Sequence, residues 1–399
     1  MKPVGLTRAL MRGRIAAILV SLIFISCPWT GVESLSEETE RYEVEIVEDN
    51  FNQTGYIRND IHHSPDGEAH VSRPDIYWVT AAQGMISIRT GACSVAIEQL
   101  GEVWMMGGRT DPNPTQSGDE IASNQIETME IENKTWWPAQ VNLPHAQQYC
   151  EAEMVGDLVI VVGEWNRNSN PYVPPSGRVQ IYNISNETWY SGRSMPSSHE
   201  RGNGGMAEEG GMLYYAGGFR NAAGTDATNR TYRYDPATDL WTRMADMNQP
   251  RASFELVNFQ GLLYAIGGTQ STSTWNRQAL NYVEVYDPST DTWTNLSSLP
   301  QAMFGWGATV HHNEIVLVGG FNGGAKKSVY HWNPVEDTWN QGRDINSIGH
   351  FDVEVQSLNG SIVWGTGDMS SYPYSTWSQM FSADTEFMNS SDHFSGWIT

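Results

Sequence analysis

The stretch Leu263-Tyr-Ala-Ile-Gly267-Gly268, followed by Tyr286-Asp-Pro-Ser-Thr-Asp-Thr-Trp293, decides the fold because its pattern recurs along most of the chain. An apolar run ends in a glycine doublet at Gly107-Gly108, Gly217-Gly218, Gly267-Gly268 and Gly319-Gly320. Two degenerate copies fit the same frame, Val159-Ile-Val-Val-Gly163-Glu164 and Ile362-Val-Trp-Gly365-Thr-Gly367. Successive first glycines lie 56, 54, 50, 52 and 46 residues apart. This self-similarity predicts one structural unit that is used six times.

Each unit predicts four short antiparallel strands. Two apolar runs split by a turn precede the glycines, and an alternating run and a tryptophan run follow a variable loop. The first five units carry the tryptophans Trp136, Trp189, Trp241, Trp293 and Trp339, and the sixth is expected to end in Phe387. The glycines are expected where a larger side chain would collide with the adjoining chain. A lone four-stranded sheet cannot bury both faces, so the units must pack together, and a closed ring protects their edges.

The pattern of Gly-Gly, then Tyr, then Trp at about 50 residues resembles the kelch repeat, over roughly residues 85–388. The resemblance implies an all-β, six-bladed β-propeller with four antiparallel strands per blade. Residues 74–80 contain Trp78, whose spacing to Met85 and Arg89 repeats almost completely that of Trp241 to Met247 and Arg251. We therefore expect an N-terminal strand that completes the sixth blade and closes the ring. A seventh blade from residues 42–80 is the alternative, but that stretch has no glycine doublet.

The N-terminus predicts export. Four basic residues precede an apolar run at residues 15–26, as in a secretory signal, and this run is short for a membrane span. We expect a signal peptide at 1–34, an acidic flexible lead-in at 35–73, the propeller at 74–388 and a C-terminal tail at 389–399. A lipobox at Cys27, which would give a lipid anchor at the cell surface, is the alternative to cleavage near residue 34. Cys93 and Cys150 are then either a disulfide pair or two buried thiols.

The formal net charge of −23 excludes nucleic acid as a partner, since such a field repels phosphate backbones. No serine elbow, zinc spacing or phosphate loop is present, so no catalytic residue, metal or cofactor is predicted. The pairs Asp235/Asp239 and Asp287/Asp291 recur with the turn, which favours turn chemistry over calcium binding. Eight Asn-x-Ser/Thr sequons begin at Asn52, Asn133, Asn183, Asn186, Asn229, Asn295, Asn359 and Asn389. Glycosylation and ordinary turn preference both explain them.

Two sets of residues are candidates for binding a protein or carbohydrate partner. The loops after the glycines are long and differ between units, and they carry aromatic residues that suit sugar rings or protein surfaces, among them Trp165, Trp275 and Tyr374. Near the start of each innermost strand, 15 to 18 residues before the glycine, lie Arg89, His145, His199, Arg201, Arg251 and His350, with Trp306 in the fifth unit. We expect this second set to form a cationic channel mouth for an anionic ligand such as a uronate, sialate or sulfated glycan.

The sequence therefore predicts an exported, non-enzymatic kelch β-propeller that binds glycan or protein. A secreted carbohydrate-active enzyme on the same scaffold is the rival. The kelch resemblance offers two such enzymes. In the first, the chain is similar to a six-bladed sialic-acid mutarotase, and Glu200-Arg201 would supply an acid–base pair. In the second, the chain is similar to galactose oxidase, a copper enzyme whose Tyr-His dipeptide is matched by Tyr330-His331.

Overall fold

The computed structural model describes residues 61–63, 69–71, 77–80, 85–87, 89–110, 121–164, 176–196, 202–221, 223–271, 278–346, 349–367 and 385–389. The chain divides into two compact units, 1–54 and 55–399, and all described residues belong to the second. The predicted signal peptide, Cys27, most of the lead-in, the tail beyond Asn389 and the loop residues Trp165, Trp275 and Tyr374 lie outside the described residues. So do His199, Glu200 and Arg201. None of the described residues forms a helix long and apolar enough to cross a membrane.

The described residues form four-stranded antiparallel sheets, called blades here. Blade 1 contains β4 (Cys93–Ile97), β5 (Glu102–Met106), β8 (Ile126–Glu130) and β9 (Thr135–Pro138). Blade 2 contains β10 (Glu151–Val155), β11 (Leu158–Glu164), β12 (Ser176–Asn183) and β13 (Thr188–Gly192), and blade 3 contains β14 (Gly205–Glu209), β15 (Met212–Ala216), β16 (Thr231–Asp235) and β17 (Leu240–Arg243). Blade 4 contains β18 (Glu255–Phe259), β19 (Leu262–Ile266), β20 (Val283–Asp287) and β21 (Thr292–Asn295), and blade 5 contains β22 (Phe304–His311), β23 (Glu314–Phe321), β24 (Val329–Asn333) and β25 (Thr338–Gln341).

A sixth four-stranded sheet, blade 6, joins residues from both ends of the described chain. It combines β26 (Glu354–Leu358), β27 (Ser361–Gly365) and β28 (Thr385–Asn389) with β3 (Tyr77–Thr80). Trp78 pairs with Met388 in the register in which Trp241 pairs with Tyr234, so β3 occupies the place of a fourth strand. The expectation that Phe387 takes the tryptophan position is wrong, because Phe387 lies on the third strand and pairs with Val79.

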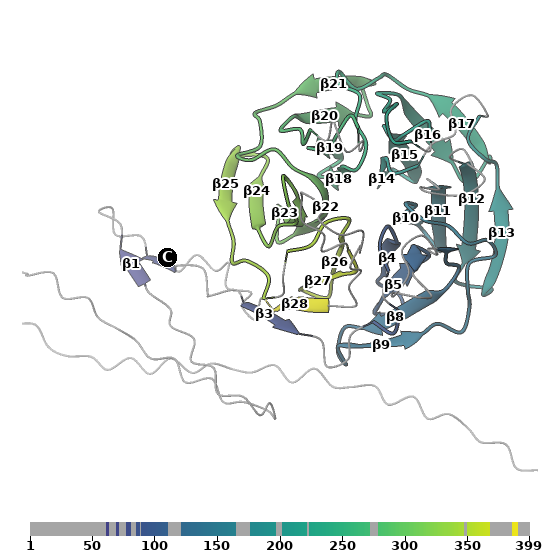
Figure 1. Ribbon diagram of the computed structural model, residues 1–399, viewed down its shortest axis with the longest axis horizontal. Helices are drawn as coiled ribbons and strands as arrows, with labels where there is room; N and C mark the ends of the chain where they lie inside the picture. Colours follow the sequence, from purple (N-terminus) through teal and green to yellow (C-terminus); the bar gives the residue numbers. More distant parts are fainter. Residues whose placement is uncertain are drawn as a thin grey trace, which may run out of the picture. The chain divides into compact units, whose positions relative to one another are not determined.

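The innermost strands follow one another around a channel in the order β4, β10, β14, β18, β22 and β26, and β26 contacts β4 (Figure 1). The hydrophobic core is divided accordingly into clusters that each join two neighbouring blades. One cluster packs Leu358 and Val363 of blade 6 against Val103 and Trp136 of blade 1. The predicted all-β propeller with four antiparallel strands per blade is confirmed.

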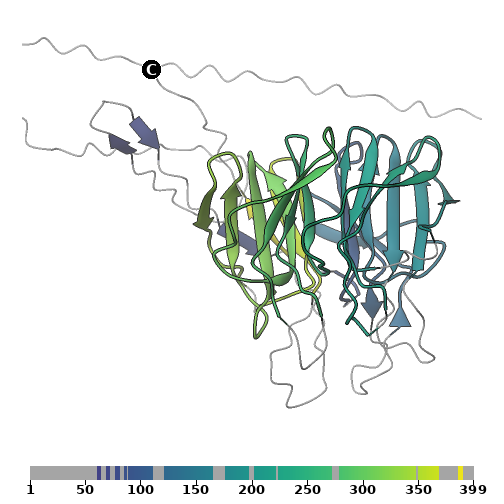
Figure 2. The same ribbon diagram turned by 90° about the horizontal axis from the view of Figure 1, so that it is seen from above.

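The strands stand side by side between two ends of the ring (Figure 2). We call the mouth end the one at which the first strand of each blade begins and the second finishes, so that the loops after the glycines leave there. The turn end is the opposite one, where tight turns join the first strand to the second and the third to the fourth. Two smaller sheets complete the structure: β6 (Arg109–Thr110) with β7 (Ile121–Ala122), and β1 (Ile61–His63) with β2 (Ala69–Val71). The second is a hairpin within the segment predicted as a lead-in.

The glycine doublets bring neighbouring blades into contact at the mouth end. The first glycine of each doublet has a positive φ, and a Cβ on Gly107 or Gly267 would lie 2.5 or 2.6 Å from a carbonyl oxygen of the next blade. The second glycine donates its N–H to that same carbonyl, as from Gly108 to Gln147 and from Gly268 to Met303. The predicted collision with the adjoining chain is therefore confirmed, and it explains why only glycine fits.

The outer strands of blades 3 and 4 are joined to the preceding blade. Trp241 stacks against Tyr234 with ring centroids 4.9 Å apart and donates its indole N–H to the carbonyl of Arg193 at 2.7 Å. Asp239 accepts hydrogen bonds from the Tyr234 hydroxyl and from the Arg193 N–H, and Asp235 caps its own turn. These aspartates thus serve turn and inter-blade contacts. Among the five repeat tryptophans Trp136 is fully buried and the others are half-buried.

Candidate functional site

A pocket lies at the mouth end of the channel, and all six blades contribute to its lining. Its rim consists of one equivalent residue per blade: Gly91, Tyr149, Asn203, Ser253, Gly305 and Asp352. All six have a positive φ between 51° and 61°. The left-handed conformation is unfavourable for residues with a side chain, so its appearance at every equivalent position indicates a common structural demand.

That demand is a chain of backbone hydrogen bonds around the rim. Five of the six rim N–H groups donate to the rim carbonyl of the preceding blade: Tyr149 to Gly91, Asn203 to Tyr149, Ser253 to Asn203, Gly305 to Ser253 and Asp352 to Gly305, at 2.5–3.1 Å. Asn203 also donates its side-chain amide to the Ser253 hydroxyl at 2.7 Å. The rim is therefore built mainly by the backbone.

Three carboxylates lie below the rim on alternate blades. Glu151 of β10, Glu255 of β18 and Glu354 of β26 each follow a rim residue by two positions and line the pocket. The equivalent residues of the intervening blades are Cys93, Gly205 and Gly307, which are small. All three glutamates are half-buried, and Glu354 accepts a hydrogen bond from the Ser94 hydroxyl at 2.9 Å. The channel level just inside the mouth is thus acidic.

The carboxylates share a protein environment that favours their neutral forms. Burial raises the pKa of Glu151 well above its ordinary value, and the charges of Glu255 and Glu354 raise it further. Burial and the charges of Glu354 and Glu153 likewise raise the pKa of Glu255. Burial raises the pKa of Glu354 to about 8, although the Ser94 hydrogen bonds oppose this rise. Glu153 lies two residues after Glu151 on β10, and its pKa is raised to about 8 by burial and by the charge of Glu208.

Arg89 and Arg251 are not cations of the channel mouth, which corrects the sequence-based hypothesis. Both are fully buried. Arg89 pairs with Glu127 at 2.5 Å and donates to the carbonyl oxygens of Gly107 and Gln125. Arg251 pairs with the buried Glu284 and donates to the carbonyl oxygens of Gly267 and Tyr282. Each guanidinium ties the first strand of its blade to the second and third, so its charge is neutralised within the blade.

The other described candidates, His145, Trp306 and His350, include two buried side chains and one exposed side chain. In blade 2 the uncharged Gln147 takes the position of the buried arginines and hydrogen-bonds Gln180 and the Gly163 carbonyl. His145 beside it has an exposed side chain, while its backbone bonds to Gln180. His350 is fully buried with its ring 4.8 Å from that of Trp364, and Trp306 is a buried member of the core between blades 4 and 5. Of these described candidates, only His145 has an exposed side chain.

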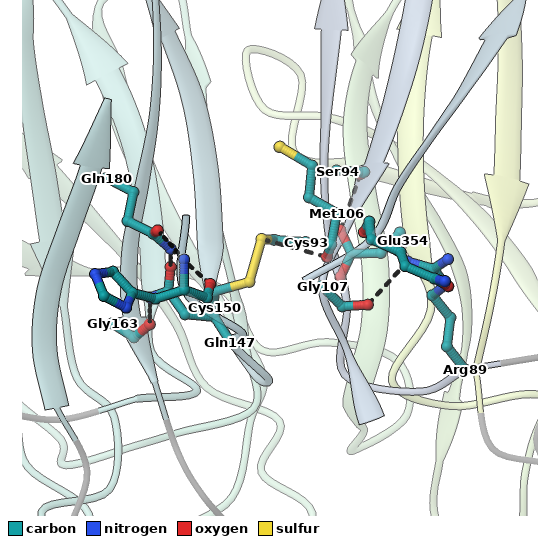
Figure 3. The surroundings of a disulfide bond; sticks show 12 residues. Arg89, Cys93, Ser94, Met106, Gly107, Gln147, Cys150, Gly163, Gln180 and Glu354 are labelled. Atoms are coloured by element: carbon teal, nitrogen blue, oxygen red, sulfur yellow. Dashed lines mark hydrogen bonds between the residues drawn. A yellow bond between two sulfur atoms is a disulfide. The ribbon is translucent and has the colours of Figure 1, made fainter. Parts of the chain in front are cut away.

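Cys93 and Cys150 form a disulfide that links blade 1 to blade 2 beside the rim (Figure 3). In Figure 3 the Arg89 side chain lies on one side of this bond and the Gln147–Gln180 pair on the other.

Because Cys93 and Cys150 are bonded to each other, neither supplies the Cys–Tyr crosslink of a galactose-oxidase-like centre. His331 lies with Nδ1 3.4 Å from a Glu314 carboxylate oxygen, beside the turn that joins β22 to β23 at the turn end. Among the described residues, no group of three or more His, Cys, Asp or Glu side chains is arranged to hold a metal ion.

The sequence reasoning missed the channel carboxylates and the rim. A signal was present, because Glu151, Glu255 and Glu354 each stand four residues after the buried Arg, Gln or His position. An acidic residue in an innermost strand, which packs between blades, is unusual enough to mark a channel-lining position.

The fold and the repeat define a β-propeller of the kelch type, with a polar pocket at one end of its channel. The chain belongs to the Attractin/LZTR1 β-propeller family, whose model matches residues 75–330. It is 32% identical over 167 residues to Kelch-like protein 36 of Rattus norvegicus, covering 41% of this chain and 26% of that protein. It is 24% identical over 256 residues to Kelch-like protein 15 of Homo sapiens, covering 60% and 40%. The chain thus matches less than half the length of either relative.

Among solved structures, the chain is similar to one titled "Structure of YjhT", with a TM-score of 0.60. The match covers 75% of this chain and 95% of the other, at 13% sequence identity. At this identity the likeness concerns the fold alone.

Proposed function

We propose that this chain is an exported, six-bladed kelch propeller, closed by its N-terminal strand, that binds a glycan or protein ligand at the mouth end. The observation that carries the proposal is the position of the pocket, which opens at the end where the loops after the glycines leave their blades. Those loops contain the aromatic residues Trp165, Trp275 and Tyr374. A rim held by backbone hydrogen bonds, with variable side chains around it, suits recognition by loops on a rigid scaffold.

The ligand class follows from the charges at the mouth. The buried arginines are paired within their blades, and the carboxylic side chains that line the pocket are those of Asp352, Glu151, Glu255 and Glu354. The pocket lining contains no Lys, Arg or His, so an anionic ligand would find no positive charge there, and the net charge of −23 disfavours its approach. We therefore propose a neutral glycan or a neutral to basic protein surface in place of the uronate, sialate or sulfated glycan first expected.

Two features support export. The leader combines basic residues with an apolar run, and the disulfide between Cys93 and Cys150 is typical of an oxidising compartment. The proposal places the chain outside the cytoplasm, either free or held at the surface through a lipid on Cys27.

The test is a glycan array, followed by a panel of purified extracellular protein domains, with the secreted chain and matched variants. Trp165→Ala, Trp275→Ala and Tyr374→Ala should each weaken binding at least tenfold. Trp137→Ala is the control, since Trp137 is exposed on the outer strand β9. Equal binding by all four variants and the unaltered chain would contradict a mouth-end site. Turnover of galactose or sialic acid by the secreted chain would favour the rival, a secreted carbohydrate-active enzyme.

A further inference from the structure

Three of the four exposed sequons among the described residues lie at the end of the ring opposite the pocket. The fourth, Asn295, ends β21 at the mouth end, where its Oδ1 accepts a hydrogen bond from the Asn248 amide at 3.0 Å. Asn133 lies in the turn between β8 and β9, Asn186 between β12 and β13, and Asn359 between β26 and β27. All three turns are at the turn end, and all three side chains are exposed. They belong to blades 1, 2 and 6, which are consecutive around the ring.

The local contacts of these asparagines are compatible with a bulky substituent. Asn186 accepts a hydrogen bond through Oδ1 from the Thr188 hydroxyl of its own sequon at 2.5 Å. Asn133 interacts through Nδ2 with the side chain of Glu130, which belongs to the same turn. Both contacts stay within a few residues of an exposed turn, so replacing an amide hydrogen of Asn133 or Asn186 by a sugar displaces no neighbouring blade. Asn359 is also exposed, and its Nδ2 lies near Gly101 in a turn of blade 1.

The sequon at Asn229 provides the contrast. Asn229 is half-buried at the mouth end and donates its Nδ2 to the carbonyl of Met247 at 2.8 Å, while its own carbonyl accepts the Met247 N–H at 2.8 Å. This reciprocal pair fixes the segment entering β16 to the segment that follows β17. A glycan on Nδ2 would remove one bond and force the two segments apart. Asn229 is therefore expected to be structural.

The turns of blades 3 to 5 differ from those of blades 1 and 2. The turns between their third and fourth strands contain Asp235, Asp287 and Asn333, each of which accepts backbone N–H bonds of its own turn, and none is part of a sequon. Ordinary turn preference therefore accounts for the Asp or Asn at these positions. It does not require a Ser or Thr two residues after an asparagine, which blades 1, 2 and 6 have at the exposed positions.

We propose that Asn133, Asn186 and Asn359 are acceptors of N-linked glycans, which cover one sector of the turn end. The inference rests on the proposed export. In the transfer, Asn Nδ2 forms a bond to C1 of the first sugar of a polyprenyl-diphosphate-linked oligosaccharide. The C1–O bond to the diphosphate breaks, the diphosphate leaves, and Nδ2 loses a proton. Such glycans are bulky and solubilising, which suits a surface without a ligand.

The test expresses the full chain in cells that perform N-glycosylation, once with its own leader and once with a proven secretion signal in place of residues 1–34. Peptide mass spectrometry after enzymatic deglycosylation in heavy-oxygen water should find Asn133, Asn186 and Asn359 converted to labelled aspartate, with Asn229 unchanged. Asn133→Gln, Asn186→Gln and Asn359→Gln should each remove one glycan from the intact mass. Asn229→Gln is the control and should remove none.

The two leaders separate the inference from the export proposal. If only the proven signal gives secreted protein and the three sites are occupied, export by the native leader fails and the site assignment stands. If the protein secreted by the proven signal carries no glycan at the three turn-end sites, or carries one at Asn229, the assignment is overturned.

Discussion

The channel carboxylates should make the ring less stable as the pH rises from 5 to 8. The pKa of Glu153 is about 8 in the folded chain, against an ordinary value of 4.5. Because the folded-state pKa is the higher one, the folded chain keeps a proton that the unfolded chain releases. The stabilisation is therefore complete below about pH 4.5 and is lost as the pH rises toward 8. Glu354 behaves in the same way, since its pKa is also about 8.

The magnitude follows from this difference. Between 4.5 and 8 the linkage sets an upper limit of about 5 kcal/mol for one carboxyl. The side chain is half-buried, so solvent screening should reduce the effect to about 1–2 kcal/mol. Glu153→Gln keeps the shape and removes the charge. It should raise the melting temperature at pH 8 by about 4 °C and leave it nearly unchanged at pH 5.

The assay is thermal unfolding by circular dichroism at half-unit steps from pH 5 to pH 8. Glu354→Gln should reproduce the result from another blade, while Glu132→Gln, at an exposed turn position, is the control and should follow the unaltered chain. If Glu153→Gln and Glu354→Gln keep the full pH dependence of the unaltered chain, the carboxylates do not hold protons in the folded channel and the reasoning is refuted.

Three further predictions concern the stability of the blades and of the contacts between them. Cys93→Ser should lower the free energy of unfolding by about 4 kcal/mol, from the chain entropy of a disulfide with a sequence separation of 57, and a reductant should bring the unaltered chain to the same melting temperature. Gly267→Ala should lower the free energy of unfolding, measured in urea, by about 2–4 kcal/mol, because its Cβ would meet a carbonyl oxygen of the next blade. Gly210→Ala is the control and should cost about 1 kcal/mol, since Gly210 has a similar φ and open surroundings. Equal urea midpoints for the two variants would contradict this. Arg251→Ala should destabilise by about 3–5 kcal/mol through the unpaired Glu284 and leave ligand affinity of the folded fraction unchanged.

The blades were predictable from sequence because the repeated residues report backbone constraints. Gly267 marks a point where two chains approach too closely for a Cβ, and the Tyr286–Trp293 pair marks neighbouring strands of one sheet. Each constraint acts within one repeat or between adjacent repeats, so it is visible as a pattern of fixed spacing. The closing strand was predictable for the same reason, since Trp78 keeps the spacing of Trp241.

The site was harder to predict because charge is visible in a sequence while its partner is not. Arg89 and Arg251 resemble ligand-binding cations until Glu127 and Glu284, 38 and 33 residues further along, are found beside them. Burial cannot be deduced from the residue type alone, and an arginine is rarely buried unless it is paired. The carboxylates of Glu151 and Glu255 come together only because blades 2 and 4 face one shared channel, which a pattern within a single repeat does not encode.

The rim explains how one scaffold combines a fixed ring with a variable pocket. Its hydrogen bonds join backbone groups, so they place few demands on side chains, and residues as different as Gly91, Tyr149 and Asp352 occupy equivalent positions. The equivalent positions just below the rim also differ, since Cys93 forms a disulfide between two blades where Glu151 carries a carboxyl group. Substitutions of the channel glutamates should therefore change charge, proton binding and ligand preference while the blades keep their register. Substitutions of Gly267 or Arg251 should do the opposite, because Gly267 closely approaches the next blade and Arg251 joins the strands of its own blade.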